Sequence, residues 1–313
     1  MEPLVSVIIP NYNHSRFLKD RIDSVLNQTY RNIEVIILDD CSQDNSRDII
    51  NQYRTHSNIS HIVFNEINSG STFHQWHKGF ALAKGEYIWI AESDDVASPD
   101  FIKKLLEAIN GDTSVVLAAS AITVIDENGI EINHLSISKT NKIKKYSSED
   151  FIKENMLLGN HLFNASSAIF RKEALNSMPD DYSRLRASGD YLFWLEIALR
   201  GKIIEIPERL DFFRKSSFAV TPRLYGNGVT FEEALTIFAW LQEKGFIKGI
   251  YKNLVIAFRL RQIRKSNKFN NEDIRSKCYN MWYNQNNFHA FDSIILTIYG
   301  AYRKISRALK SII

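Results

Sequence analysis

The feature that most constrains the fold is the alternation of apolar runs with amphipathic segments over the first 125 residues. The apolar runs have the length and composition of buried strands, and they lie at 5–10, 33–38, 61–65 and 87–91. The segments 15–26 and 72–83 between them carry apolar residues at helical spacing, with Ser15, Asp44 or Asn45, and Ser98–Pro99 as expected helix starts. Buried strands joined by helices predict an α/β fold with a mostly parallel central sheet covered on both faces.

The pattern continues to about residue 217 and then changes. Further strands are predicted at 115–126, 166–171 and 203–214, a helix at 188–200, and a mobile polar loop at 133–148. From residue 230 onward the chain reads as helical and basic. We therefore expect an α/β domain at 1–228, with halves 1–110 and 111–228, and a helical C-terminal region at 229–313.

Charge and cysteine content narrow the class of protein. The net charge is +3 with a pI of about 8.6, which is too mild to require a nucleic-acid partner. The segment 231–313 holds 14 Lys or Arg against 6 Asp or Glu, so the basic charge is concentrated there. Cys41 and Cys278 offer neither a disulfide framework nor metal-ligand spacing, which favours a reducing cytoplasmic setting. The short apolar run near residue 1 and the lack of a long apolar stretch lead us to expect neither a signal peptide nor a transmembrane helix.

Polar clusters follow three of the predicted strands. They are Pro10–Asn13, Asp39–Asp40 and Asp94–Asp95. Because parallel sheets bind ligands at the carboxyl ends of their strands, the three clusters predict one site at a single edge.

Each cluster has two interpretations. Asp94–Asp95 suits a hard divalent cation that carries phosphates, or alternatively an N-cap for the helix after Ser98. Asp39–Asp40 suits acceptance of a hydrogen bond from a base imide or ribose, or alternatively a turn. Tyr12 suits stacking on a base, or alternatively packing at the sheet rim.

Glycine-rich phosphate loops are absent from the sequence. Neither G-x-G-x-x-G after the first strand nor G-x-x-x-x-G-K-[ST] occurs. A bound nucleotide therefore needs a metal and side chains to neutralise its phosphates.

Four ordered segments together resemble family 2 glycosyltransferases. They are 5–13 (VSVIIPNYN), 24–30 (SVLNQTY), 34–42 (EVIILDDCS) and 83–95 (AKGEYIWIAESDD). The resemblance implies the GT-A nucleotide-sugar fold and inverting transfer, of the type found in bacterial surface-polysaccharide synthesis. It is strong over about the first 100 residues and weaker to about 217.

The resemblance assigns roles in donor binding. Tyr12 lines the base pocket, which Pro10 and Asn11 shape. Asp40 accepts the imide hydrogen bond, with Asp39 beside it.

It also assigns the metal and the base. Asp95 holds the Mn²⁺ or Mg²⁺ that bridges the diphosphate, and Asp94 contacts ribose or donor sugar. Asp190, within Gly189–Trp194, resembles the acid that removes the acceptor proton. The alternative for Asp190 is an N-cap of a helix at 191–200.

Two positions depart from the family pattern. The segment 213–217 lacks the histidine that relatives often carry, so Arg214 or Lys215 is expected to contact phosphate instead. Many relatives have an Arg-Asn pair in the helix before the metal motif, where this chain has Gln75–Lys78. Lys78 or Trp76 is then expected to line the donor pocket, with core packing as the alternative for Trp76.

The last helix expected, within 292–313, is amphipathic and basic. Its apolar residues recur at spacings of three and four, with Arg303, Lys304, Arg307 and Lys310 on another face. Such a helix suits an anionic membrane surface. The alternatives are packing on the catalytic domain and packing on a second subunit of a homo-oligomer.

These observations predict a cytoplasmic, metal-dependent inverting glycosyltransferase, with peripheral contact to the inner face of the cell membrane through 292–313 as one option. Its donor is a nucleotide sugar, UDP-linked rather than dTDP- or GDP-linked, and its acceptor is a lipid-linked saccharide. One alternative is a sugar-nucleotide nucleotidyltransferase, although that chemistry favours a glycine- and arginine-rich loop where Pro10–Asn13 stands. Another is a non-catalytic glycan- or membrane-binding subunit on the same fold.

Overall fold

The computed structural model describes residues 2–135, 142–215 and 220–285, which form two compact units. Unit 1 comprises Met1–Phe151, Asn160–Arg184 and Gly189–Phe218, and unit 2 comprises Ile152–Gly159, Leu185–Ser188 and Ala219–Ile313. The predicted domain boundary at 228/229 falls inside unit 2, in the turn between its first two α-helices. No helix in the described part of the chain has the length and apolar character needed to cross a membrane.

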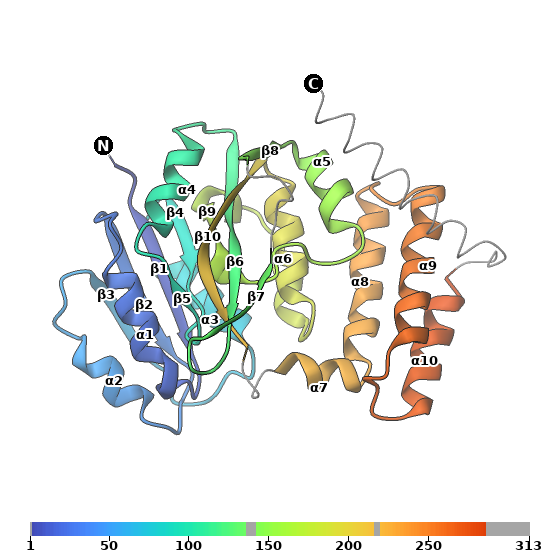
Figure 1. Ribbon diagram of the computed structural model, residues 1–313, viewed down its shortest axis with the longest axis horizontal. Helices are drawn as coiled ribbons and strands as arrows, with labels where there is room; N and C mark the ends of the chain where they lie inside the picture. Colours follow the sequence, from blue (N-terminus) through green and yellow to red (C-terminus); the bar gives the residue numbers. More distant parts are fainter. Residues whose placement is uncertain (1, 136–141, 216–219, 286–313) are drawn as a thin grey trace. The chain divides into compact units, whose positions relative to one another are not determined.

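Unit 1 is built on a central sheet (Figure 1). Its strands are β1 (Val5–Asn11), β2 (Ile33–Asp39), β3 (Ile59–Phe64), β4 (Tyr87–Ile90), β5 (Val96–Ala97), β6 (Val115–Ile125), β7 (Glu131–Leu135), β8 (Lys144–Tyr146), β9 (Ala168–Arg171) and β10 (Lys202–Arg214). The order across the described sheet is β3-β2-β1-β4-β9-β6-β10-β5, with β7 beside β6 and β8 beside β10. Strands β1 to β4 pair in parallel, as do β6 and β10, which confirms the predicted α/β class and mostly parallel sheet. Antiparallel β9 joins these two groups.

Helices cover both faces of this sheet. On one face α1 (Ser15–Leu26), α2 (Ser46–Gln52) and α4 (Phe101–Ile109) bury apolar side chains against alternate residues of β1 and β2. On the other face lie α3 (Thr72–Leu82) and α6 (Gly189–Ala198), joined by contacts such as that of Phe80 with Phe193. A Cβ at Gly79 would lie 2.5 Å from Cγ2 of Ile8, so glycine lets α3 approach β1 closely.

Two sequence predictions need correction. The helix expected to start at Ser98–Pro99 begins at Phe101. Residues 99 and 100 form a turn closed by the Phe101 N–H, which donates to the carbonyl of Ser98, while the carbonyl of Pro99 accepts from Thr29. The loop expected at 133–148 contains the end of β7 and all of β8, which pair with β6 and β10 as edge strands. Their polar composition suits a strand with one exposed edge. Residues 136–141 lie outside the described part.

Short helical elements complete unit 1. They are α5 (Ser148–Phe151), η2 (Ala165–Ser167), η3 (Lys172–Leu175) and η4 (Asp181–Arg184). The element η1 (Ile152–Met156) belongs to unit 2.

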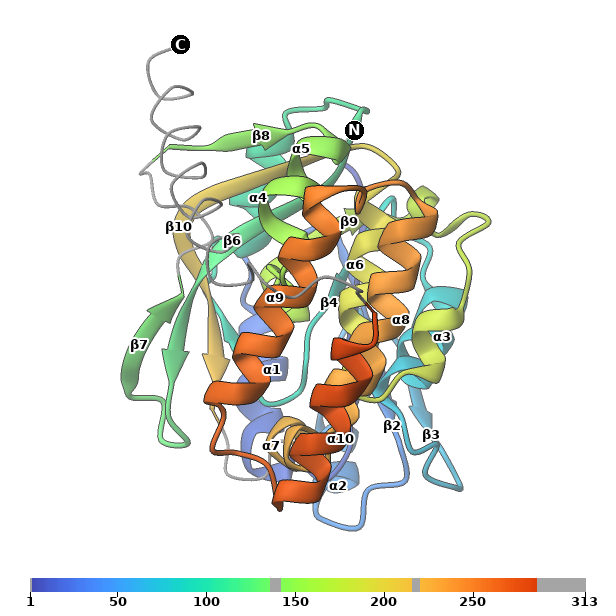
Figure 2. The same cartoon turned by 90° about the vertical axis from the view of Figure 1, so that its right-hand side faces the viewer.

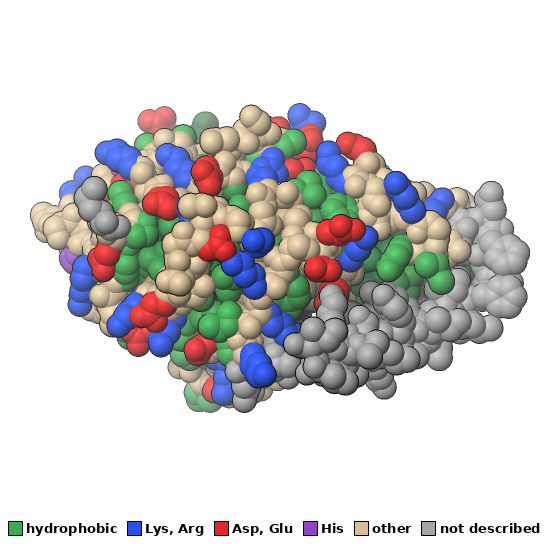
Figure 3. Space-filling model, turned by 90° about the horizontal axis from the view of Figure 1, so that it is seen from above, with side chains coloured by type: hydrophobic (Ala, Val, Ile, Leu, Met, Phe, Trp, Pro, Cys, Tyr) green, Lys and Arg blue, Asp and Glu red, His purple; other side chains and the backbone are tan. Residues whose placement is uncertain are grey.

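Unit 2 contains the helices α7 (Val220–Gly226), α8 (Val229–Glu243), α9 (Ile250–Lys265) and α10 (Glu272–Tyr283). Figures 1 and 2 show α8, α9 and α10 side by side. Trp282 is fully buried, packs on Phe238 and donates its indole N–H to the carbonyl of Phe231 at 3.0 Å. The predicted helical C-terminal region is confirmed in this part, whereas the helix expected within 292–313 lies outside the described residues. On the face of the molecule seen in Figure 3, Lys and Arg side chains are interspersed with Asp and Glu side chains.

Candidate active site

The first two polar clusters meet at the carboxyl edge of the parallel strands. Asn11 ends β1 and is paired in register with Asp39, which ends β2. The Asn11 amide donates to Oδ1 of Asp39 at 2.8 Å, and the Asp40 N–H donates to the carbonyl of Asn11 at 2.8 Å. The structure therefore brings Asn11, Asp39 and Asp40 together as predicted.

Asp39 is a buried turn-forming residue. Its Oδ2 accepts the N–H of Ser42 at 3.1 Å and faces Nε of Arg47 at 3.3 Å. This turn places Cys41 at a φ of 63°, the left-handed region that a non-glycine residue seldom adopts. The carboxylate of Asp39 thus points into the protein and supports the backbone that follows β2.

Asp40 anchors the loop that follows β3. Its carboxylate accepts hydrogen bonds from the side chains of Asn65 at 2.7 Å and Gln75 at 2.9 Å, and from the N–H and hydroxyl of Ser69 at 2.9 and 2.8 Å. A longer bond of 3.2 Å comes from Asn68. The sequence alone did not indicate this loop, because its polar residues follow no strand or helix periodicity.

Two predicted donor-binding side chains at this edge are open to solvent. Tyr12 is 44% exposed, directly after β1. Lys78 is exposed on α3, and its ammonium donates to Asn65 Oδ1 at 2.5 Å, next to the Asp40 network. Pro10, by contrast, is buried within β1. A flat ligand at this edge would meet an aromatic ring and a cation.

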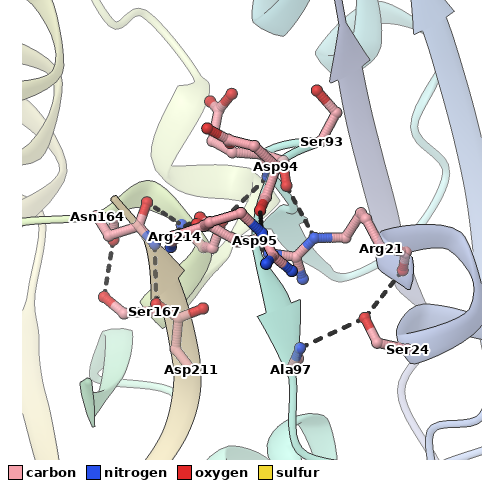
Figure 4. Close-up of polar contacts among 12 residues, drawn as sticks. Arg21, Ser24, Ser93, Asp94, Asp95, Ala97, Asn164, Ser167, Asp211 and Arg214 are labelled. Carbon is pink, nitrogen blue, oxygen red and sulfur yellow. Dashed lines mark hydrogen bonds and ion pairs between the residues drawn. The ribbon is translucent and has the colours of Figure 1, made fainter. Parts of the chain in front are cut away.

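Asp95 lies at the centre of a buried polar cluster after β4 (Figure 4). Its Oδ2 accepts from the Asn164 amide at 2.7 Å and the Ser166 hydroxyl at 2.8 Å, and its Oδ1 accepts the N–H of Arg214 at 2.9 Å. Nη2 of Arg21 lies 3.7 Å from Oδ2. None of these donors belongs to α4, so the N-cap interpretation does not hold for Asp95.

Arg214 holds the backbone around this cluster. Its Nε donates to the carbonyl of Asp94 at 2.8 Å, and Nη1 donates to the carbonyls of Asp126 and Glu127 at 3.2 Å each. The guanidinium also lies 4.7 Å from the ring centre of Phe17. The side chain predicted to contact phosphate is thus 4% exposed and bonded to protein carbonyls.

Asp94 differs from its neighbour. Its side chain is half-buried, and within the described residues its carboxylate makes no hydrogen bond or ion pair. Two positions earlier, Glu92 accepts the indole N–H of Trp76 at 3.0 Å. Burial, reinforced by the Asp94 carboxylate, raises the pKa of Glu92 to about 8. Asp94 is therefore the carboxylate of this turn that remains available to a ligand.

The residues that support Asp95 were not predicted. Asn164 also donates to Asp211 Oδ2 at 2.8 Å, and burial raises the pKa of Asp211 well above its usual value. Arg21 occupies a position on α1 that helical spacing assigns to the core, beside Leu18 and Ile22. Because a charged residue is rarely buried without a partner, Arg21 at a core position was the sequence signal that pointed to this buried polar cluster.

Asp190 lies in the first turn of α6. The side-chain amide of Asn160 donates to its Oδ2 at 2.8 Å, and the N–H of Tyr191 donates to its Oδ1 at 2.8 Å. Because α6 begins at Gly189, Asp190 lies inside the helix and not at the predicted cap position. Trp76, which is 2% exposed, packs on Phe193 of the same helix and belongs to the core.

A cavity of about 290 Å³ lies elsewhere in unit 1. It is lined by Glu86, Arg171, Lys172, Glu173 and Asn176. Glu86 precedes β4, so this cavity is at the amino end of that strand, opposite to Asp94.

Comparison with known proteins identifies the class. The sequence model of the family described as "Glycosyl transferase family 2" matches residues 6–178. The glycosyltransferase GlyG of Streptococcus pneumoniae is 28% identical over 238 residues, which cover 70% of this chain and 73% of GlyG. The putative teichuronic acid biosynthesis glycosyltransferase TuaG of Bacillus subtilis is 42% identical over 106 residues, which cover 34% of this chain and 42% of TuaG.

Solved structures share the fold. TarS 1–349 of S. aureus in complex with UDP-GlcNAc superposes with a TM-score of 0.58 at 18% identity, covering 98% of this chain and 91% of that one. The mannosyltransferase PcManGT of Pyrobaculum calidifontis in complex with GDP-Man and Mn²⁺ gives a TM-score of 0.57 at 15% identity, covering 96% and 81%.

The architecture is thus that of the GT-A glycosyltransferases, as the sequence predicted. The chain belongs to glycosyl transferase family 2, and it is a glycosyltransferase.

Proposed function

We propose that this enzyme transfers a sugar from a UDP-sugar to a saccharide acceptor on a lipid carrier, with inversion and with a divalent metal. The observation that carries the proposal is the shared edge of β1, β2 and β4, where Tyr12 and Asp94 remain available and Asp40 is held in place. The bound nucleotide sugars of the TarS and PcManGT structures support a nucleotide-sugar donor. The name of TuaG supports a role in surface polysaccharide synthesis.

The base of the nucleotide binds beside β1 and β2. The exposed ring of Tyr12 stacks on it, with Pro10 and Asn11 fixing the backbone beneath. Asp40 accepts the imide N–H in place of its longest protein contact, the 3.2 Å bond from Asn68. Asp39 supports the turn, and Lys78 approaches the donor from α3.

We assign Asp94 as the residue that would hold the metal. The sequence predicted Asp95 as the ligand, but Asp95 is 1% exposed and its oxygens accept three hydrogen bonds from protein. Within the described residues no three His, Cys, Asp or Glu side chains converge to hold a metal. The half-buried carboxylate of Asp94 would hold Mn²⁺ or Mg²⁺, since such ions keep several waters and take only one or two protein carboxylates. When bound, the ion neutralises charge on the diphosphate.

Arg214 supports this site through the backbone of the turn that carries Asp94. Because its guanidinium is bonded to the carbonyls of Asp94 and Asp126, it fixes the turn that presents the Asp94 carboxylate. We assign Arg214 to donor binding through this turn, without a direct phosphate contact.

Asp190 is the general base. Its carboxylate, oriented by Asn160, removes the proton of the acceptor hydroxyl as that oxygen bonds to the anomeric carbon. The bond from the anomeric carbon to the diphosphate breaks, its electron pair leaves with the nucleoside diphosphate, and the configuration inverts. A carboxylate on a helix held by core packing keeps a fixed position for this step.

The placement at a membrane surface is tested with lipid vesicles. We place the enzyme at the inner face of the cell membrane, held by the basic segment 292–313. The full chain should float with phosphatidylglycerol vesicles, and a variant with Arg303, Lys304, Arg307 and Lys310 changed to Gln should not. Equal flotation of both proteins would contradict this placement.

The activity is tested by nucleotide release. The enzyme is incubated with UDP-GlcNAc, UDP-Glc, UDP-Gal, dTDP-Glc or GDP-Man, each with and without Mn²⁺ and with a saccharide acceptor panel. We expect release from a UDP-sugar that requires Mn²⁺ and falls at least a hundredfold in Asp190→Asn. Donor binding without release from any donor would favour the non-catalytic alternative.

A further inference from the structure

Glu233 holds three successive backbone amides. On α8, its Oε1 accepts the N–H of Arg186 at 2.7 Å, and its Oε2 accepts the N–H groups of Ala187 and Ser188 at 2.8 Å each. All four residues belong to unit 2. No spacing in the sequence links Glu233 to this segment, because about 45 residues separate them.

This contact restrains the backbone strongly. A hydrogen bond from a backbone N–H to a carboxylate is about twice as strong as one between neutral groups. Three consecutive amides directed at one carboxylate leave residues 186–188 little freedom to change conformation.

The neighbouring residue gives a natural comparison. Glu232 precedes Glu233 on α8, but its carboxylate pairs with Lys277 at 2.8 Å on the surface, where their side chains are 41% and 70% exposed. Of these two adjacent acids, Glu233 therefore holds the 186–188 backbone, and Glu232 makes an exposed ion pair of small energetic value.

The restrained segment leads directly into the proposed general base. Ser188 is followed by Gly189 and then Asp190. Gly189 has no room for a side chain, since a Cβ there would lie 2.5 Å from the carbonyl oxygen of Tyr182. The backbone on the amino-terminal side of Asp190 is thus fixed residue by residue, while Asn160 fixes the carboxylate itself.

We propose that Glu233 is a positioning residue for catalysis, because its hydrogen bonds to the backbone of residues 186–188 set the position of Asp190. The inference rests on the proposed function, in which Asp190 is the general base. It gives a helix of the C-terminal region a part in the transfer step, although Glu233 touches neither donor nor acceptor.

The inference predicts a split between turnover and binding. In Glu233→Gln one amide-accepting oxygen becomes an NH₂ group that faces backbone N–H donors. Residues 186–190 then shift, and a displacement of about 1 Å at a catalytic group lowers the rate by about a hundredfold. The donor site at β1, β2 and β4 contains none of these residues, so its affinity should not change.

The experiment compares full-length wild type, Glu233→Gln and the matched control Glu232→Gln. With the donor that gives most release in the panel above, we measure kcat, the donor Kd and hydrogen–deuterium exchange of residues 185–192. We expect Glu233→Gln to lower kcat at least tenfold, to leave Kd within twofold, and to speed exchange at 186–188. Glu232→Gln should resemble wild type in all three.

Two outcomes separate the inference from the proposed function. If Asp190→Asn abolishes turnover but Glu233→Gln behaves like Glu232→Gln, the positioning role is wrong and the proposed base stands. If Asp190→Asn retains turnover, the proposed function itself is wrong. A parallel loss of kcat, donor affinity and melting temperature in Glu233→Gln would show general destabilisation and would overturn the positioning role.

Discussion

Arg21 and Asp95 form an ion pair from which solvent is excluded on both sides, with 3.7 Å between Nη2 and Oδ2. Arg21 also donates from Nε to the carbonyl of Glu92 at 2.8 Å, so it holds the start and the end of the turn after β4. Burial lowers the pKa of Arg21, and Asp95 opposes this change by favouring the charged guanidinium. The main role of Asp95 is therefore structural: it pairs with the buried Arg21.

The two carboxylates of this turn should respond differently to mutation. Asp95→Ala leaves Arg21 buried without its ion-pair partner, and removing one side of such a pair costs about 3–5 kcal/mol. Asp94→Ala removes a side chain without hydrogen bonds to described residues, and should cost less than about 0.5 kcal/mol. Urea unfolding in EDTA measures both. Equal destabilisation by the two substitutions would contradict the division of roles between them.

Asp40 should be important for stability as well as for donor binding. In Asp40→Asn an NH₂ group faces the donors of Asn65, Ser69 and Gln75, and each buried donor left unsatisfied costs about 1–3 kcal/mol. We expect a loss of a few kcal/mol in urea unfolding and faster proteolysis within 65–71. Lys78→Ala is the control: it removes one exposed bond to Asn65 but leaves the carboxylate of Asp40 and its donors in place, so it should cost much less stability. A wild-type unfolding curve for Asp40→Asn would contradict the anchoring role.

The two cysteines should report on separate parts of the chain. Cys41 is partly exposed directly after Asp40, whereas Cys278 is 1% exposed and burial raises the pKa of its thiol. Iodoacetamide at pH 8 should therefore modify Cys41 first and Cys278 only after unfolding.

Nucleotide binding should change this reactivity. With Mn²⁺ present, UDP should slow alkylation of Cys41 and leave Cys278 unaffected, as peptide mass spectrometry would show. Unchanged labelling of Cys41 at saturating UDP would place the base away from Asp40.

Glu92 should make the metal-free enzyme less stable at alkaline pH. Its folded-state pKa of about 8 is above the unfolded value, so its contribution to stability is complete below about pH 4.5 and is lost as the pH rises through 8. Glu92→Gln keeps an acceptor for Trp76 and does not ionise. Between pH 6 and 9 in EDTA, the melting temperature of wild type should fall more steeply than that of Glu92→Gln. Parallel curves would contradict the raised pKa.

The sequence predicted the site residues whose positions follow from the regular pairing of the strands. The strands ending in Asn11, Asp39 and Ile90 are continuous buried runs, and parallel pairing brings their ends together whatever the side chains are. The family resemblance added Asp190, which the structure places on α6.

The remaining features depend on contacts between distant segments. The bonds from Asn65 and Gln75 to Asp40, from Asn164 to Asp95 and from the backbone amides of residues 186–188 to Glu233 join distant segments without a common periodicity. The proposed exchange of roles between Asp94 and Asp95 has the same origin, because adjacent acids look alike in sequence until their burial is known.

The central claim is that Asp94 and a divalent ion bind the diphosphate of a UDP-sugar at the edge of β1, β2 and β4. Calorimetric titration of UDP into the folded enzyme tests it most directly, with Mn²⁺ or EDTA, for wild type, Asp94→Asn and the control Asp100→Asn. We predict that Mn²⁺ strengthens binding at least tenfold, about 1.4 kcal/mol, in wild type and Asp100→Asn but not in Asp94→Asn. UDP binding that is equally tight with EDTA, or unchanged in Asp94→Asn, would contradict the account.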